Sequence, residues 1–324
     1  MSSFETTPSL ISGLNNERLR NAHDALHMYS GTELSEWVAS HTRVRTLGSQ
    51  SFRMLVAPGE DPRKVLFSGG ELGNGLDALG AIARLRTIAE AVSPEATIVY
   101  QPNTTLTQDN MNFSRAERRV LRQGSNTPMT DRILVTISEL KDATDFTAYG
   151  PSQGGTTVLD FAADERSPAT ATALLETPNI EDRSLIRIGK DYADSGKMLH
   201  STIQQNFTQT APLLNDLLGG ITNPAMIGYG LGLVKQDNLA LIAPMRRSAA
   251  ESQITAALHK EGSIVHAWAT GGTVASHAVN LAIADRLDGH ARYEAHVVEG
   301  DHSATNNYLF SAAIVQRAID LKRS

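Results

Sequence analysis

The sequence contains no cysteine among its 324 residues. This absence excludes disulfide bonds, thiolate nucleophiles and zinc sites built from thiolates. Aromatic residues are also scarce, at 5% of the chain, and the formal net charge of −6 comes with no long basic run. Nucleic acid and anionic membranes are therefore not indicated as partners.

No stretch of the sequence is apolar over the ~20 residues that a membrane-spanning helix needs. Residues 1–13 are mostly polar and lack a basic segment followed by an apolar core, so no signal peptide is expected. Hydrophobic residues make up 41% and charged residues 20% of the chain, as in ordinary soluble globular proteins. We expect a soluble, cytoplasmic protein, and the sequence leaves its oligomeric state open.

Strand and helix patterns alternate over most of the chain after residue 50. This alternation predicts an α/β fold with a mostly parallel central sheet and helices on both of its faces. The first two predicted strands are close enough in sequence to form a hairpin. Strands are predicted at 51–57, 64–68, 96–100, 145–149, 170–175, 238–243, 263–269 and 293–298.

Two segments depart from this alternation. Residues 1–50 are predicted as a helical N-terminal extension, because apolar residues recur at helical spacing between 16 and 40. Residues 179–236 combine a helical stretch with a glycine-rich apolar run, and we interpret them as an inserted cap or lid. The α/β core then comprises 51–178 and 237–324.

The motif Gly150-Pro151-Ser152-Gln153-Gly154 lies between a predicted strand and a predicted helix. Gly-x-Ser-x-Gly in this context is typical of a nucleophile elbow, a sharp turn that exposes the serine hydroxyl above the sheet. The turn is crowded, and Gly150 and Gly154 leave space on both sides of the serine. The fixed φ of Pro151 suits an extended residue at that position. Ser152 is therefore the candidate nucleophile.

A serine hydroxyl becomes strongly nucleophilic only when a base accepts its proton. Among the ten histidines, His302 is the best candidate, because it follows the last predicted strand in a Gly-Asp-His turn. His277 follows another predicted strand and remains a rival. His266 and His296 lie inside predicted strands, where structural roles are expected.

Two backbone N–H groups are needed to stabilise the negative charge that develops on the substrate oxygen. The amide of Gln153, directly after the serine, is the first candidate. The second is expected in the loop after strand 64–68, where glycine lets the backbone approach closely. Either Gly70 or Glu71 would donate there.

The strand followed by Gly-Gly, the Gly-Pro-Ser-Gln-Gly-Gly motif and the late Gly-Asp-His together resemble the α/β-hydrolase superfamily over residues 50–324. The resemblance implies a Ser-acid-His triad in this chain order, acting on a small-molecule ester, thioester, amide or related acyl substrate. It implies no cofactor, and no metal site is predicted. Residues 179–236 occupy the place of the variable cap in that superfamily.

The resemblance does not decide which residue is the acid of the triad. The superfamily usually places it after the strand that precedes the histidine strand, but here strand 263–269 is followed by Thr-Gly-Gly-Thr, without a carboxylate. Some members carry the acid one strand after the nucleophile, and Glu176 stands at that point as our first choice. Glu251 is the second choice and Asp301 the third.

The sequence thus predicts a serine hydrolase that cleaves a carboxylic ester or related acyl substrate through an acyl-enzyme. Two alternatives remain. The missing carboxylate at the usual place favours a catalytically inactive binding or scaffold protein of the same fold. A dry, lidded site would favour acyl transfer to an acceptor other than water.

Overall fold

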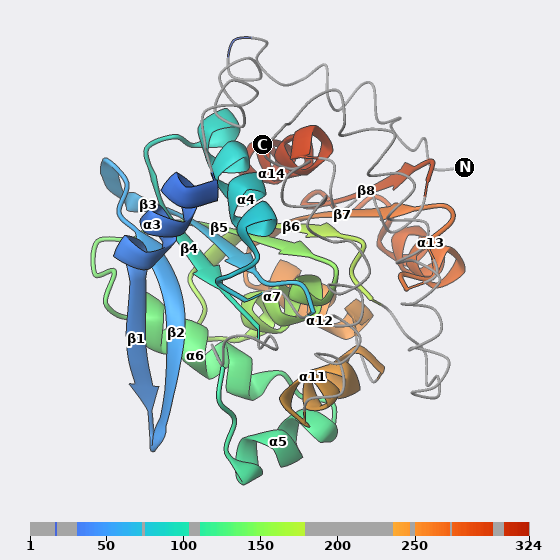
Figure 1. The fold of residues 1–324 in the computed structure, drawn as a ribbon. Coiled ribbons are helices and arrows are strands. Elements are labelled where there is room, and N and C mark those ends of the chain that lie inside the picture. The colour runs from blue at the N-terminus through green and yellow to red at the C-terminus, as the bar shows by residue number, and fades with distance from the viewer. Residues whose placement is uncertain are drawn as a thin grey trace.

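The computed structural model describes residues 17, 31–72, 75–103, 111–178, 236–246, 250–272, 274–300 and 308–323. Within these residues, eight strands form one sheet in the order β1-β2-β4-β3-β5-β6-β7-β8 (Figure 1). β2 is antiparallel to β1 and to β4, and every other neighbouring pair in this sheet is parallel. The strands are β1 (Thr42–Leu47), β2 (Gln50–Ala57), β3 (Asp61–Gly69), β4 (Ala96–Gln101), β5 (Asp145–Pro151), β6 (Ala169–Leu175), β7 (Ser263–Ala269) and β8 (Tyr293–Val298).

Helices cover both faces of this sheet. Figure 1 shows α4 and α14 above it and α6, α7 and α12 below it. The helices are α3 (Gly31–His41), α4 (Leu79–Val92), α5 (Arg115–Arg122), α6 (Thr127–Ile137), α7 (Gln153–Ala163), α11 (Gln236–Arg246), α12 (Ala250–His259), α13 (His277–Leu287) and α14 (Tyr308–Arg323).

The core is divided by the sheet into two apolar layers. Successive residues of β3 show the division: Val65 and Phe67 pack in the layer between the sheet and α6, α7 and α12, whereas Leu66 packs in the layer between the sheet and α4 and α14. Both faces of the central strands are therefore buried, as expected for parallel strands between helical layers. The predicted α/β architecture is confirmed.

Three local predictions are corrected. Residues 42–47, assigned to the helical extension, form β1, which pairs with β2 in an antiparallel hairpin. The expected hairpin between 51–57 and 64–68 does not form, because β4 lies between β2 and β3. Residues 238–243 belong to helix α11 and not to a strand, since a short apolar run fits a buried strand and a buried helical turn equally well.

Several predictions concern segments outside the described residues. These segments include the proposed cap apart from residue 236, most of residues 1–30, and the residues Asp301 and His302.

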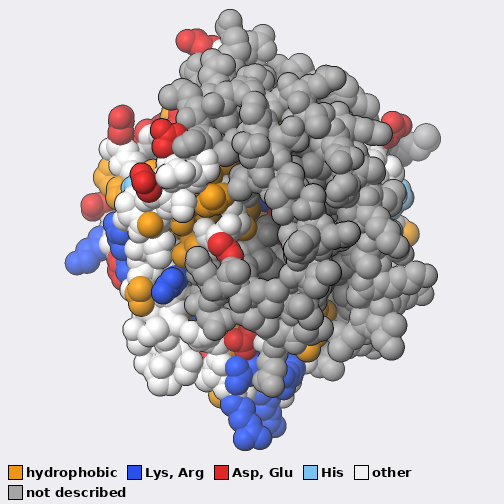
Figure 2. Space-filling model, viewed as in Figure 1, with side chains coloured by type: hydrophobic (Ala, Val, Ile, Leu, Met, Phe, Trp, Pro, Cys, Tyr) orange, Lys and Arg blue, Asp and Glu red, His pale blue; other side chains and the backbone are white. Residues whose placement is uncertain are grey.

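A basic region lies on the part of the surface that helix α5 forms. In Figure 2, Lys and Arg side chains gather at the bottom of the view, over α5. Arg115, Arg119 and Arg122 are exposed there, whereas Arg118 pairs with Asp237 at 3.0 Å. Among the described helices, none is long and apolar enough to cross a membrane.

Candidate active site

Ser152 lies on the turn between β5 and α7, and its residue is 3% exposed. Its backbone has φ 48° and ψ −131°, a combination that is strained for any residue with a side chain. The turn is held by two hydrogen bonds: Ser152 N–H donates to the carbonyl of Leu175, and Gly155 N–H donates to the carbonyl of Ser152, each at 2.8 Å. This strained strand–turn–helix is the geometry expected of a nucleophile elbow.

The glycines around the serine are required by close backbone contacts. A Cβ on Gly150 would lie 2.5 Å from the Cα of Gly155, and a Cβ on Gly154 would lie 2.4 Å from the carbonyl oxygen of Gly69. Neither position can accept a side chain unless the backbone moves. The second contact also brings the end of β3 against the first turn of α7.

The loop after β3 therefore lies beside the elbow, as the prediction of an oxyanion site requires. Gly70 N–H donates to the carbonyl of Gln101 at 2.8 Å. Because this amide is already used by the backbone, Glu71 is the candidate donor that we consider further in this loop. The Glu71 carboxylate forms an ion pair with Arg84 of α4 at 3.1 Å, and both side chains are largely buried.

Sequence reasoning did not identify Asn103, which follows β4 and is fully buried. Its side-chain nitrogen donates to the carbonyls of Gly70 and Glu71 and to the side-chain oxygen of Gln153, at 2.9, 2.7 and 2.8 Å. No motif marks this residue. The only signal in the sequence was a polar side chain in the loop after a predicted strand, at the edge where the other candidate residues gather.

Glu176 follows β6 and is completely buried. Its φ of 53° is unusual for a residue with a side chain. Its N–H donates to the carbonyl of Ala267 at 2.9 Å, and its carboxylate accepts a hydrogen bond from Ala269 N–H. The side chain thus crosses from the end of β6 to the end of β7, where the sequence itself provides no carboxylate.

A glycine lies close to this carboxylate. A Cβ on Gly272 would lie 2.9 Å from Oε2 of Glu176. The neighbouring Gly271 N–H donates to the carbonyl of Gly300 at 2.8 Å. Gly300 is two residues before His302 in the sequence, and through Gly271 it lies near Gly272, the glycine closest to the Glu176 carboxylate.

The other candidate carboxylate has a different environment. Glu251 lies in the first turn of α12, and among the described residues the element before it is helix α11 in place of the predicted strand. Arg286 holds its two carboxylate oxygens with two hydrogen bonds, at 2.7 and 2.6 Å, and both side chains are exposed. The structure therefore favours Glu176 over Glu251.

His277, the rival of His302, and the two strand histidines all have structural partners. His277 accepts a hydrogen bond at Nδ1 from the indole N–H of Trp268, at 2.9 Å. His266 hydrogen-bonds the hydroxyl of Tyr293, and burial lowers its pKa to about 4. His296 contacts Glu294 at 2.6 Å.

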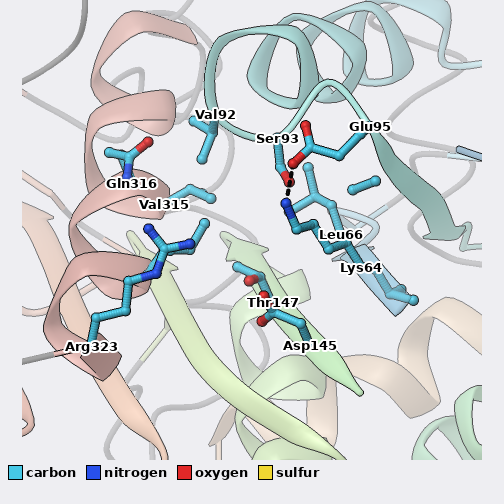
Figure 3. A pocket seen from close by; sticks show the side chains of 13 residues that line it. Lys64, Leu66, Val92, Ser93, Glu95, Asp145, Thr147, Val315, Gln316 and Arg323 are labelled. Carbon is cyan, nitrogen blue, oxygen red and sulfur yellow. Dashed lines mark hydrogen bonds and ion pairs between the residues drawn. The ribbon is translucent and has the colours of Figure 1, made fainter. Parts of the chain in front are cut away.

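A cavity of about 130 Å³ lies at the opposite end of the sheet (Figure 3). Lys64 and Asp145, at the amino ends of β3 and β5, line it together with Arg323 of α14. Lys64 forms an ion pair with Glu95 there. Ligands of open parallel sheets bind at the carboxyl ends of the strands, so this cavity is separate from the candidate site. Among the described residues, no cluster of three or more His, Asp or Glu side chains could hold a metal ion.

Neither a family model nor a curated protein matches this sequence. Its fold is similar to that of a membrane phospholipase A described as a bacterial virulence factor (TM-score 0.58, 13% identity, 90% of each chain). It is also similar to the enol-lactonase from Burkholderia xenovorans LB400 (TM-score 0.55, 14% identity, 87% of this chain and 100% of that chain). A third similar structure is a haloalkane dehalogenase from Bradyrhizobium elkani USDA94 (TM-score 0.53, 11% identity, 87% and 98%).

These likenesses confirm that the chain has the α/β-hydrolase fold, which its sequence motifs predicted. At identities of 11 to 14% they establish the fold alone. Enzymes that share a fold can differ in chemistry, so the reaction must be argued from the residues of the site.

Proposed function

We propose that this chain, built on the α/β-hydrolase fold, is a serine hydrolase that cleaves a carboxylic ester or a related acyl compound. One observation carries the proposal: Ser152 occupies a strained turn between β5 and α7, with φ 48°. Strain of this size persists only where the surrounding structure enforces it, and it is concentrated at functional sites. The similarity to known hydrolytic enzymes supports the reaction class.

The mechanism assigns a role to each candidate residue. The hydroxyl of Ser152 attacks the acyl carbonyl while His302 accepts its proton. The imidazolium then protonates the leaving alcohol, which leaves an acyl-enzyme ester on the serine. Water, deprotonated by His302, releases the acid and restores the hydroxyl. The backbone N–H groups of Gln153 and Glu71 stabilise the oxyanion in both halves of the reaction.

Glu176 orients His302 and stabilises its charged form in this mechanism. Two observations support the assignment. The Glu176 carboxylate is buried at the end of β7. Gly300, two residues before His302 in the sequence, accepts a hydrogen bond from Gly271, and the next residue, Gly272, lies close to that carboxylate. The same observations weaken the argument for an inactive binding protein, which rested on the lack of a carboxylate at this strand end. Acyl transfer to an acceptor other than water remains a variant of the same proposal.

A fluorophosphonate probe tests the nucleophile directly. The serine oxygen displaces fluoride from phosphorus, so only an activated serine is labelled. We expect stoichiometric labelling of the wild type and none of Ser152→Ala. Ser167→Ala is the matched control, because Ser167 is also buried but lies in the turn before β6. Folded wild type that resists the probe, or Ser152→Ala that is still labelled, would refute the proposal.

A further inference from the structure

Asn103 lies between the two backbone segments that the proposed mechanism uses as oxyanion donors. On one side are Gly70 and Glu71, at the end of β3, and on the other is Gln153, at the start of α7. The two hydrogens of its amide serve three acceptors within 2.9 Å, so one hydrogen is shared. The residue is 0% exposed, which makes these bonds strong and costly to lose.

We propose that Asn103 is the positioning residue of the oxyanion hole: it fixes the direction of the Glu71 N–H and ties it to the elbow. This inference rests on the proposed hydrolase function. It adds a residue that neither the motif nor the triad includes.

Peptide geometry links Asn103 to the direction of the Glu71 N–H. The bond between Gly70 and Glu71 is trans, as are all peptide bonds among the described residues. In a planar trans peptide, the C=O of the first residue and the N–H of the second point in opposite directions. Asn103 binds the carbonyl of Gly70. It therefore sets the plane of this peptide and turns the Glu71 N–H away from itself.

The side chain of Gln153 is held by hydrogen bonds at both of its ends. Its Oε1 accepts from Asn103, and its Nε2 donates to the hydroxyl of Thr157 at 3.3 Å. Its backbone N–H is the first of α7, and the first N–H groups of a helix have no acceptor within the helix. Bonds at both ends of its side chain hold the residue whose N–H is the other proposed donor.

A second interaction holds the loop that contains Glu71, so the effect of Asn103 on the peptide direction can be distinguished from an effect on folding. The Glu71 side chain is held from α4 by Arg84, at 3.1 Å. Because of this ion pair, loss of Asn103 leaves the loop attached but lets the Gly70–Glu71 peptide rotate. The expected effect is therefore on the transition state, where a misdirected N–H fails to meet the oxyanion, and not on substrate binding.

The experiment compares Asn103→Ala with Asn126→Ala in the full-length protein. Asn126 is also buried, but it precedes α6 and bonds through its backbone to Asp160. Turnover of p-nitrophenyl butyrate is measured per active site, counted by fluorophosphonate labelling at saturation. We expect kcat to fall ~10–100-fold in Asn103→Ala with KM within ~3-fold, since removing one oxyanion donor outright costs about 100–1,000-fold. Asn126→Ala should keep the wild-type kcat per site.

A second readout responds to the oxyanion hole and not to folding. A trifluoromethyl ketone forms a tetrahedral oxyanion with the serine, and its Ki should rise in Asn103→Ala by about the same factor as kcat falls. If Asn103→Ala does not fold, Asn103→Ser, which keeps a hydroxyl donor, should fold and show a smaller rise in Ki.

The outcomes separate this inference from the proposed function. Active wild type with unchanged kcat per site and unchanged Ki in the variant would overturn the role of Asn103 alone. A KM effect without a kcat effect would do the same. Wild type that neither labels nor turns over ester would overturn the hydrolase function, and this inference with it.

Discussion

The buried carboxylate of Glu176, which follows β6, accepts a hydrogen bond from the backbone N–H of Ala269, the last residue of β7. A carboxylate that follows one strand thus lies at the end of the next strand. The glycines after β7 leave room for it, since a Cβ on Gly272 would lie 2.9 Å from Oε2. This relationship explains how a chain without a carboxylate after β7 can still place one there.

Replacement of Glu176 by Gln should lower kcat by about 100- to 10,000-fold, because a neutral amide cannot stabilise the imidazolium. The glutamine oxygen can still accept from Ala269 N–H, so the fold should be kept. The check is ester turnover per labelled site, with circular dichroism to verify folding.

Glu251→Gln is the control for this prediction. Glu251 is exposed and paired with Arg286 on the surface, so turnover should stay at the wild-type level. A large loss of ester turnover in Glu251→Gln, together with full turnover in Glu176→Gln, would favour Glu251 over Glu176 as the acid.

Replacement of Gly154 by Ala should destabilise the protein and lower its activity. Alanine favours a helix over glycine by about 1 kcal/mol, but its Cβ would lie 2.4 Å from the carbonyl oxygen of Gly69. Because the obstructing atom belongs to the backbone of β3, the clash outweighs the gain, at a net cost of about 1–3 kcal/mol. Urea unfolding measures the cost.

Gly31→Ala provides the comparison for Gly154→Ala. Gly31 begins α3, and no atom lies within 4 Å of the added Cβ. Its stability should equal or exceed that of the wild type. Equal stability of the two variants would show that β3 and α7 are less tightly packed than described.

Two Arg–Glu pairs allow a test of burial. Arg84 and Glu71 are both largely buried, so Arg84→Leu leaves a carboxylate inside the protein without its ion-pair partner and should cost about 3–5 kcal/mol. Arg286 and Glu251 are exposed. The urea concentration at the unfolding midpoint of Arg286→Leu should therefore equal that of the wild type. Similar losses of unfolding free energy in both variants would contradict the difference in burial between the two ion pairs.

Stability should fall in acid because of His266. Burial holds its pKa at about 4 in the folded state, whereas an unfolded histidine titrates near 6.5. Between these values the unfolded chain binds more protons, so stability decreases as the pH falls, by about 2 kcal/mol at pH 5 from this residue.

His266→Asn removes this titration and keeps an acceptor for Tyr293. The variant will be less stable at pH 7, but the difference between its unfolding free energies at pH 7 and pH 5 should be smaller than in the wild type by about that amount. Parallel pH profiles for the two proteins would show that His266 is not neutral and buried as described.

The sequence by itself determined the features that depend on local pattern. Alternating strand and helix periods predicted the architecture, and Gly150 and Gly154 marked the elbow because that turn cannot accept side chains. Helix–strand ambiguity misled where a run was short: residues 238–243 were expected as a strand and form part of α11. Such runs are decided by what they pack against, which a sequence window does not contain.

Only the tertiary structure decided which residues meet across strands. It placed β4 between β2 and β3, where adjacency in sequence suggested a hairpin. It directed Glu176 to the end of β7, and it placed Asn103 between Gly70 and Gln153. These contacts join residues far apart in the chain, and their existence depends on strand order and backbone direction. The sequence therefore indicates which residues have suitable chemistry, because motifs are local. The contacts that bring these residues together depend on the tertiary structure.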